Sequence, residues 1–173
     1  MAITNQQRTA LNGVIKRINA ALVESIKPRE LEPVGRFAID IIVKRTRLGY
    51  GVSRNYGFKE SLRKLSSKYI KRRQRISLGE LTTPKKSNLT LTGQMLRSMD
   101  IISAVPGKVV IGPTGNRQSI GNEKRVPTNA EVAAYQEKQG RVFNRVSTYE
   151  FQQIVRFYRR TFGDLLGKKK LLG

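Results

Sequence analysis

The side chains that most clearly carry chemistry in this chain are cations placed at helical spacing. Between residues 64 and 75, Lys and Arg recur at steps of three and four, and Glu60 is the only acidic residue close to them. A solvated helix face would ordinarily include acidic residues that pair with such cations. We therefore predict an interface for an anionic partner, either the phosphates of a nucleic acid or an acidic protein surface. With two lysines from the connection that follows, the candidate residues are Lys64, Lys68, Lys71, Arg72, Arg75, Lys85 and Lys86.

Residues suited to catalysis or metal binding are scarce. The chain has no Cys and no His, which excludes thiol nucleophiles, imidazole bases and the usual zinc sites. Two glycine-rich stretches, Gly49–Gly51 and Gly112–Gly115, lack the lysine and hydroxyl residue of a phosphate-binding loop. The acidic residues are scattered, and Glu131 and Glu137 fit a solvated helix surface. We predict that the protein is not an enzyme and uses no metal or cofactor.

The overall charge favours the same kind of partner. In 173 residues, 34 Lys and Arg stand against 12 Asp and Glu, which gives a net charge of +22. A chain so charged repels itself and should seek an anionic partner, as nucleic-acid-binding proteins and many assembly proteins do. The start, MAITNQQRTA, has no apolar signal core, and the most apolar run, FAIDIIV, is too short to cross a bilayer. We expect synthesis in the cytoplasm and no membrane partner.

Apolar periodicity predicts helices in the first half of the chain. Residues 5–26 and 33–47 place Leu, Ile and Val at three- and four-residue steps, with Pro33 in the first turn of the second helix. The stretch RLGYGVSRNYG reads as a loop because of its three glycines. A third helix, from Lys59 to Arg75, would carry the cations, and a long polar connection would follow it.

A small sheet is predicted after that connection. A short helix capped by Thr92 is expected over Leu91–Met99, followed by antiparallel strands over Asp100–Val105 and Lys108–Ile111. We expect their loop to be longer than the Pro106–Gly107 pair, since a type II turn suits a two-residue hairpin poorly.

Two capping boxes predict the last helices. Helices should begin after Thr128 and after Ser147, with Gly140 stopping the first and the second running to about Thr161. The expected fold is α+β, with amphipathic N-terminal helices packed on a small antiparallel sheet, long loops and a C-terminal helix. We expect one domain over residues 1–163, helical to about 76 and with the sheet and last helix over about 88–163. Residues 164–173 would form a flexible basic tail.

Several short motifs occur in a characteristic order between residues 49 and 154. They are a basic segment around LSSKY, the joint NLTLTGQMLRSM, a strand closing in VVIG, and a glycine with RVF before the last helix. The residues that carry the pattern are Leu65, Ser66, Tyr69, Leu89, Thr92, Gly93, Leu96, Ser98, Ile111, Gly112, Gly140, Arg141 and Phe143. In this order the chain resembles the tailed-phage virion morphogenesis family, described as tail-completion, neck or head–tail joining proteins. Many members have a His where this chain reads Tyr135-Gln136-Glu137.

The resemblance implies a structural virion protein without enzymatic activity. It would form a ring of six or twelve copies in the neck or connector, or complete the tail for joining to the capsid portal. Its partners would be portal, connector, tail-terminator or tube proteins, with phage DNA in the channel as a further candidate. Thr92, Gly93, Gly112 and Gly140 would then be structural joints, where glycine lets the chain turn sharply. The alternative reading is a basic nucleic-acid-binding protein.

Overall fold

The computed structural model describes residues 27–53, 57, 59–75, 85–89, 93–119 and 125–170, with side chains described as far as residue 162. The predicted helix over residues 5–26 and the cap at Thr92 lie outside this part of the chain. The elements are α2 (Pro28–Arg47), β1 (Tyr50–Val52), β2 (Lys59–Ser61), α3 (Ser67–Arg75), α4 (Gln94–Arg97), β3 (Met99–Val105), β4 (Lys108–Pro113), α5 (Asn129–Lys138) and α6 (Thr148–Lys170). The strands form two separate two-stranded antiparallel sheets, β1–β2 and β3–β4. The predicted α+β class is confirmed.

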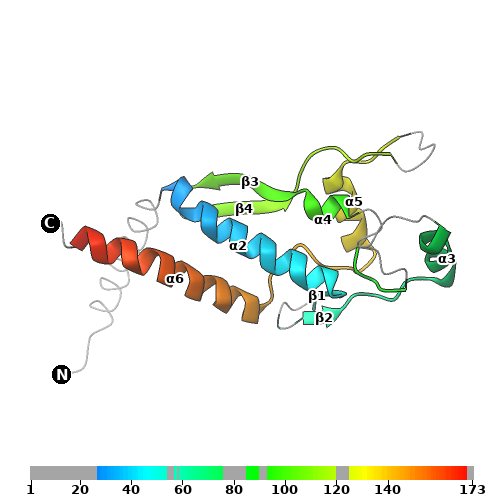
Figure 1. Cartoon of the computed structure of the whole chain (residues 1–173), viewed down its shortest axis with the longest axis horizontal. Coiled ribbons are helices and arrows are strands. Elements are labelled where there is room, and N and C mark those ends of the chain that lie inside the picture. Colours follow the sequence, from blue (N-terminus) through cyan, green and yellow to red (C-terminus); the bar gives the residue numbers. More distant parts are fainter. Residues whose placement is uncertain are drawn as a thin grey trace, which may run out of the picture.

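Helix α2 lies between the β3–β4 hairpin and α6, which runs in the opposite direction (Figure 1). Its buried side chains recur at helical spacing, so that one stripe meets the hairpin and another meets α6. On the hairpin side, a Cβ at Gly35 would lie 3.0 Å from both Ile101 Cδ1 and Val109 Cγ2, so the missing side chain permits close approach. On the other side, Phe37 stacks on Phe157 with ring centroids 4.3 Å apart.

The most deeply buried cluster lies at the C-terminal end of α2, where α4, α5 and the segment before α6 meet. Phe143 and Ile42 are fully buried there. The cluster's buried members are Ile42, Met95, Leu96, Met99, Ala133 and Phe143. These elements hold the region to which α3 is attached, while α3 itself stands out at the end of the molecule (Figure 1).

Helix α2 begins earlier than predicted. Pro28, and not Pro33, occupies the first turn, because a proline at that position loses no helical hydrogen bond. The backbone N–H of Lys27 donates to the Glu30 carboxylate over 2.9 Å, which helps to close the first turn. Pro33 lies inside the helix and is exposed, so water can hydrate the carbonyl group that lacks its helical donor.

The predicted loop after α2 and the predicted helix from Lys59 are both wrong in part. Tyr50–Val52 and Lys59–Ser61 pair as strands, and only Ser67–Arg75 is helical. Tertiary contacts hold β1 in place: the Val52 N–H donates to the Val142 carbonyl over 2.8 Å, and a Cβ at Gly51 would overlap that same carbonyl oxygen. The glycine that indicated a loop is therefore a point of close backbone approach.

The β3–β4 hairpin agrees with the prediction except at its turn. Val105 pairs directly with Lys108, so the loop has only two residues, and the expected longer loop is wrong. Gly107 has φ +70°, as a type II turn requires at its third position. The register shifts between Ile101 and Ser103, and a bulge of this kind adds the twist that a type II turn lacks.

Both capping boxes are confirmed, and α5 and α6 begin where they predict. Gly140, with φ +76°, follows the end of α5 as expected. Helix α6, however, continues to Lys170. The prediction that it ends near Thr161 and is followed by a flexible tail from residue 164 is therefore wrong. Gly163 and Gly167 do not stop it, because a helical glycine costs only about 1 kcal/mol relative to alanine.

Candidate anion-binding cleft

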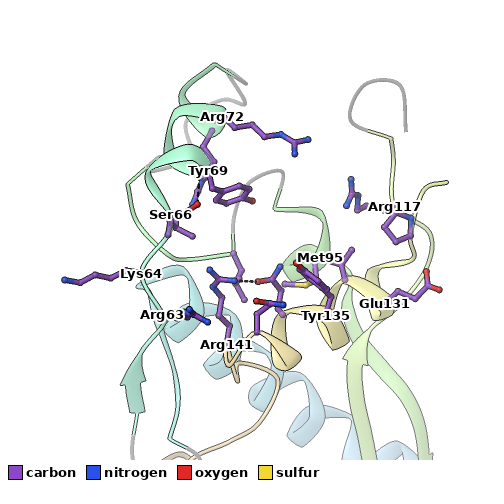
Figure 2. A pocket seen from close by; sticks show the side chains of 17 residues that line it. Arg63, Lys64, Ser66, Tyr69, Arg72, Met95, Arg117, Glu131, Tyr135 and Arg141 are labelled. Atoms are coloured by element: carbon purple, nitrogen blue, oxygen red, sulfur yellow. Dashed lines mark hydrogen bonds between the residues drawn. The ribbon is translucent and has the colours of Figure 1, made fainter. Parts of the chain in front are cut away.

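A cleft of about 730 Å³ lies between α3 and the elements α4 and α5. Figure 2 shows Tyr69 and Arg72 reaching from α3 toward the side that carries Arg117, with Met95 and Tyr135 between them. Most of its charged lining is cationic. The basic residues are Arg63, Lys64, Arg72, Arg73, Arg117 and Arg141.

The one acidic residue in the lining is occupied by structural contacts. Glu131 accepts from the Thr128 backbone N–H over 2.9 Å and from Arg125 Nη2 over 2.6 Å. The hydrogen bond from Thr128 and the charge of Arg125 hold the pKa of Glu131 below its ordinary value. The carboxylate points away from the cleft (Figure 2), so it leaves the cationic lining largely uncompensated.

Arg73 fixes α3 to the neighbouring segment 85–89. It is 2% exposed, and it donates to the Lys86 carbonyl over 2.7 Å and to Asn88 Oδ1 over 3.2 Å. Burial lowers the pKa of this guanidinium, and Tyr69 acts in the opposite sense. The sequence prediction missed this residue, although it falls four residues after Tyr69 on the inward-facing positions of the helix.

Two arginine side chains present buried donors at the cleft. Arg141 Nη1 donates to Gln136 Oε1 over 3.1 Å, the contact drawn in Figure 2. Within the part of the chain that the structure describes, the buried Nε atoms of Arg141 and Arg73 have no hydrogen-bond partner. A buried donor without a partner is costly. Arg73 is almost fully buried and both of its Nη atoms already donate, so of these two side chains the half-buried Arg141 is the one that a ligand can reach.

Apolar side chains form the rest of the lining. Met95 is buried, while Leu65, Leu89 and Val132 are half-buried and contribute aliphatic surface. Leu89 has φ +55°, the only positive φ of a non-glycine residue among those described. Such strain is uncommon outside turns and functional sites, and here it lies in the wall of the cleft.

The cations predicted to share one helix face are divided between two surfaces in the structure. Lys64 lies before α3, so the stripe of five cations on one helix face is wrong. Lys64 and Arg72 line the cleft, while Lys68, Lys71 and Arg75 share a shallower surface with Arg72 on the other side of Tyr69. The remaining pair, Lys85 and Lys86, is exposed in the segment that Arg73 anchors.

The three glycines among the predicted joints do not all serve the same structural purpose. Gly93 has φ +68° and immediately precedes α4, and Gly140 has a positive φ after α5 with open space around it. Gly112 has no such φ, but it is buried, and a Cβ there would lie 2.9 Å from Ile102 Cδ1.

A buried ion pair behind the cleft was not predicted. Arg45 Nη1 lies 2.5 Å from Glu150 Oε2, and Arg45 Nη2 donates to the carbonyls of Phe143 and Arg145, the latter over 2.9 Å. Burial lowers the pKa of Arg45, and the Glu150 carboxylate counteracts that effect. The pair joins α2 to the start of α6, and the further bonds of Arg45 hold the segment between α5 and α6 that follows Arg141.

Comparison with protein families, with curated proteins and with solved structures finds no match to this chain. Among the described residues, no three His, Cys, Asp or Glu side chains gather to hold a metal ion. In the same part of the chain, no helix is both long enough and apolar enough to span a membrane. The cleft gathers several cations, two of which are held by hydrogen bonds, so its geometry suits the binding of an anion.

Proposed function

We propose that this chain is a structural protein of a tailed-phage virion. It acts as a ring in the neck or head–tail connector, or completes the tail for joining to the portal. The order of motifs from LSSKY to RVF supports this proposal, and so do surface features suited to contacts with other proteins. The observation that carries it is the pairing of a cationic cleft with apolar side chains left open to solvent.

Large apolar side chains are exposed on β3 and on the first turn of α6. Ile102 and Val105 on β3 are 57% and 47% exposed, and Tyr149 and Phe151 on α6 are 60% and 56% exposed. Large apolar side chains on a surface commonly mark contacts with other proteins. Among the described residues the β3–β4 sheet has two strands, and each leaves one edge that could pair with another chain.

The first test is the assembly state of the purified full-length chain. We expect closed rings by negative-stain electron microscopy and by native mass spectrometry, alone or after mixing with portal or tail proteins. A protein that stays monomeric with every such partner, and that is missing from purified virions by mass spectrometry, would overturn the proposal.

The second test reverses charge at the cationic interface. Changing Lys68, Arg72 and Arg75 to Glu should leave the fold intact, because exposed charge changes usually alter stability by less than about 0.5 kcal/mol each. We expect particles complemented with this variant to accumulate as unjoined heads and tails. The matched control reverses three exposed arginines of α6 and removes the same charge; it changes Arg156, Arg159 and Arg160. Equal titres for wild type and the α3 variant would show that α3 carries no joining contact.

Nucleic-acid binding is the second candidate function, and the same cleft supports it. Arginines beside Tyr69 and Tyr135 are the kind of residues that bind a single strand through phosphates and stacked bases. A monomer that binds oligonucleotides with steep salt dependence, and forms no ring, would favour this alternative.

A further inference from the structure

The cleft combines two kinds of surface that one ligand would have to match. Cations surround it, while Leu65, Met95 and Val132 offer aliphatic surface within it. A free inorganic anion would satisfy the arginines but leave the aliphatic surface against water. A ligand that carries both acidic and apolar groups covers both surfaces.

The donors inside the cleft suit carboxylates. Arg141 is half-buried and is held in place by its hydrogen bond to Gln136, while Arg72 is exposed at the same cleft. An arginine fixed in this way loses little side-chain entropy when it binds a carboxylate, and such charge-assisted contacts are stronger than neutral ones.

A second copy of this chain is a poor source of that ligand. The twelve acidic residues are spread along the sequence, and only Glu30 and Glu32 lie within three positions of each other. Both belong to the first turns of α2, where Glu30 is engaged with the Lys27 N–H.

We propose that the cleft binds an acidic segment of a different protein, with carboxylates against Arg72 and Arg141 and one apolar side chain against Met95 and Val132. The preference for a protein over a nucleic acid comes from the aliphatic lining, because bases stack mainly on aromatic rings and guanidinium planes. It also rests on the proposed function, in which this chain joins other virion proteins.

Three fluorescent ligands test this inference by anisotropy with the full-length chain. The first is a short peptide of Glu and Asp with a central Leu-Phe pair, the second replaces that pair with Ser-Ser, and the third is an oligothymidylate of equal charge. We expect the Leu-Phe peptide to bind at least about tenfold more tightly than the Ser-Ser peptide, because each buried apolar side chain contributes enough for a factor of this size.

Variants of the cleft locate the binding. Arg141→Gln should lower the affinity for the Leu-Phe peptide by about tenfold, because a charged hydrogen bond to the peptide is lost. Arg72→Gln removes an exposed cation at the same cleft, so a weaker affinity there reports binding without a change in the core. Arg159→Gln on α6 is the matched control, and it should leave the affinity unchanged.

Three results would overturn the inference. Tighter binding of the oligothymidylate, lost in Arg141→Gln, would make the cleft a nucleic-acid site. A loss of affinity in Arg159→Gln as large as that in the cleft variants would show that binding follows net charge alone. Equal affinity for the two peptides, or no binding of either, would remove the role of the aliphatic lining. Ring formation and presence in virions are measured separately, so this inference can fail while the proposed function stands.

Discussion

Replacing Arg45 with methionine should destabilise the fold far more than removing a surface cation, because it leaves the Glu150 carboxylate buried without its cation. The two side chains are 4% and 9% exposed, and their charged atoms are 2.5 Å apart. Removing one partner of a buried pair costs about 3–5 kcal/mol. For a chain of this size, each kcal/mol lowers Tm by about 2–4 °C, so a fall of about 6–20 °C is expected.

The adjacent residue provides a matched control. Lys44 Nζ lies 2.7 Å from Asp40 Oδ2, but both side chains are more than half exposed. Lys44→Met therefore removes the same charge from the same helix at a cost of about 0–1 kcal/mol. The comparison separates loss of a buried partner from loss of net positive charge.

A double variant tests the mechanism. Arg45→Met with Glu150→Leu removes both charges, so its cost should be well below the sum of the two single changes. Some cost remains because Glu150 Oε2 also accepts from the Ser147 N–H over 2.8 Å at the start of α6, and losing such a cap costs about 1 kcal/mol. Urea unfolding, with midpoint and slope measured for each variant, gives the free energies. Strictly additive losses, or equal losses for Arg45→Met and Lys44→Met, would refute the reasoning.

Three further changes are expected to have measurable effects. Gly51→Ala should lower Tm strongly, since the new Cβ would overlap the Val142 carbonyl oxygen; an unchanged Tm in differential scanning calorimetry would contradict the close approach. Gly93→Val should cost about 1–3 kcal/mol because of the positive φ, and Gly93→Asn much less, since Asn tolerates that region; equal urea midpoints would argue against strain. Glu131→Gln should lower stability near neutral pH and match wild type in acid. The folded-state pKa of Glu131 is depressed, so its contribution is present above the unfolded pKa and lost as pH falls through the folded one; a difference that persists at low pH would contradict this.

Local sequence signals were sufficient to predict the elements whose stabilising interactions join residues only a few positions apart. The capping boxes at Thr128 and Ser147 act between residues three positions apart, so both helix starts could be predicted. The Ile- and Val-rich segments on either side of Pro106–Gly107 likewise predicted the hairpin. The bulge near Ile102, which allows the two-residue turn, has no comparable local signal.

Long-range pairing decided what those signals could not. The sequence prediction began a helix at Lys59, yet residues 59–61 pair with β1, because Gly51 and Val52 dock against Val142 about 90 positions away. Helix α3 is shortened as a result, and its cations divide between the cleft and an outer surface. The excess of cations follows from composition alone, and it is the basis for predicting an anionic partner.

The sequence by itself determined the helix caps, the hairpin and the cationic character of the protein, because each depends on residue type or on neighbours along the chain. Only the tertiary structure decided where the cations lie and which of them are buried. It buries Arg45 and Arg73, which look like any other surface arginine in the sequence, and it brings Arg141 across from a distant segment to face α3. Burial is a property of the packed fold, and the free energy of a charge depends on burial far more than on its neighbours in sequence.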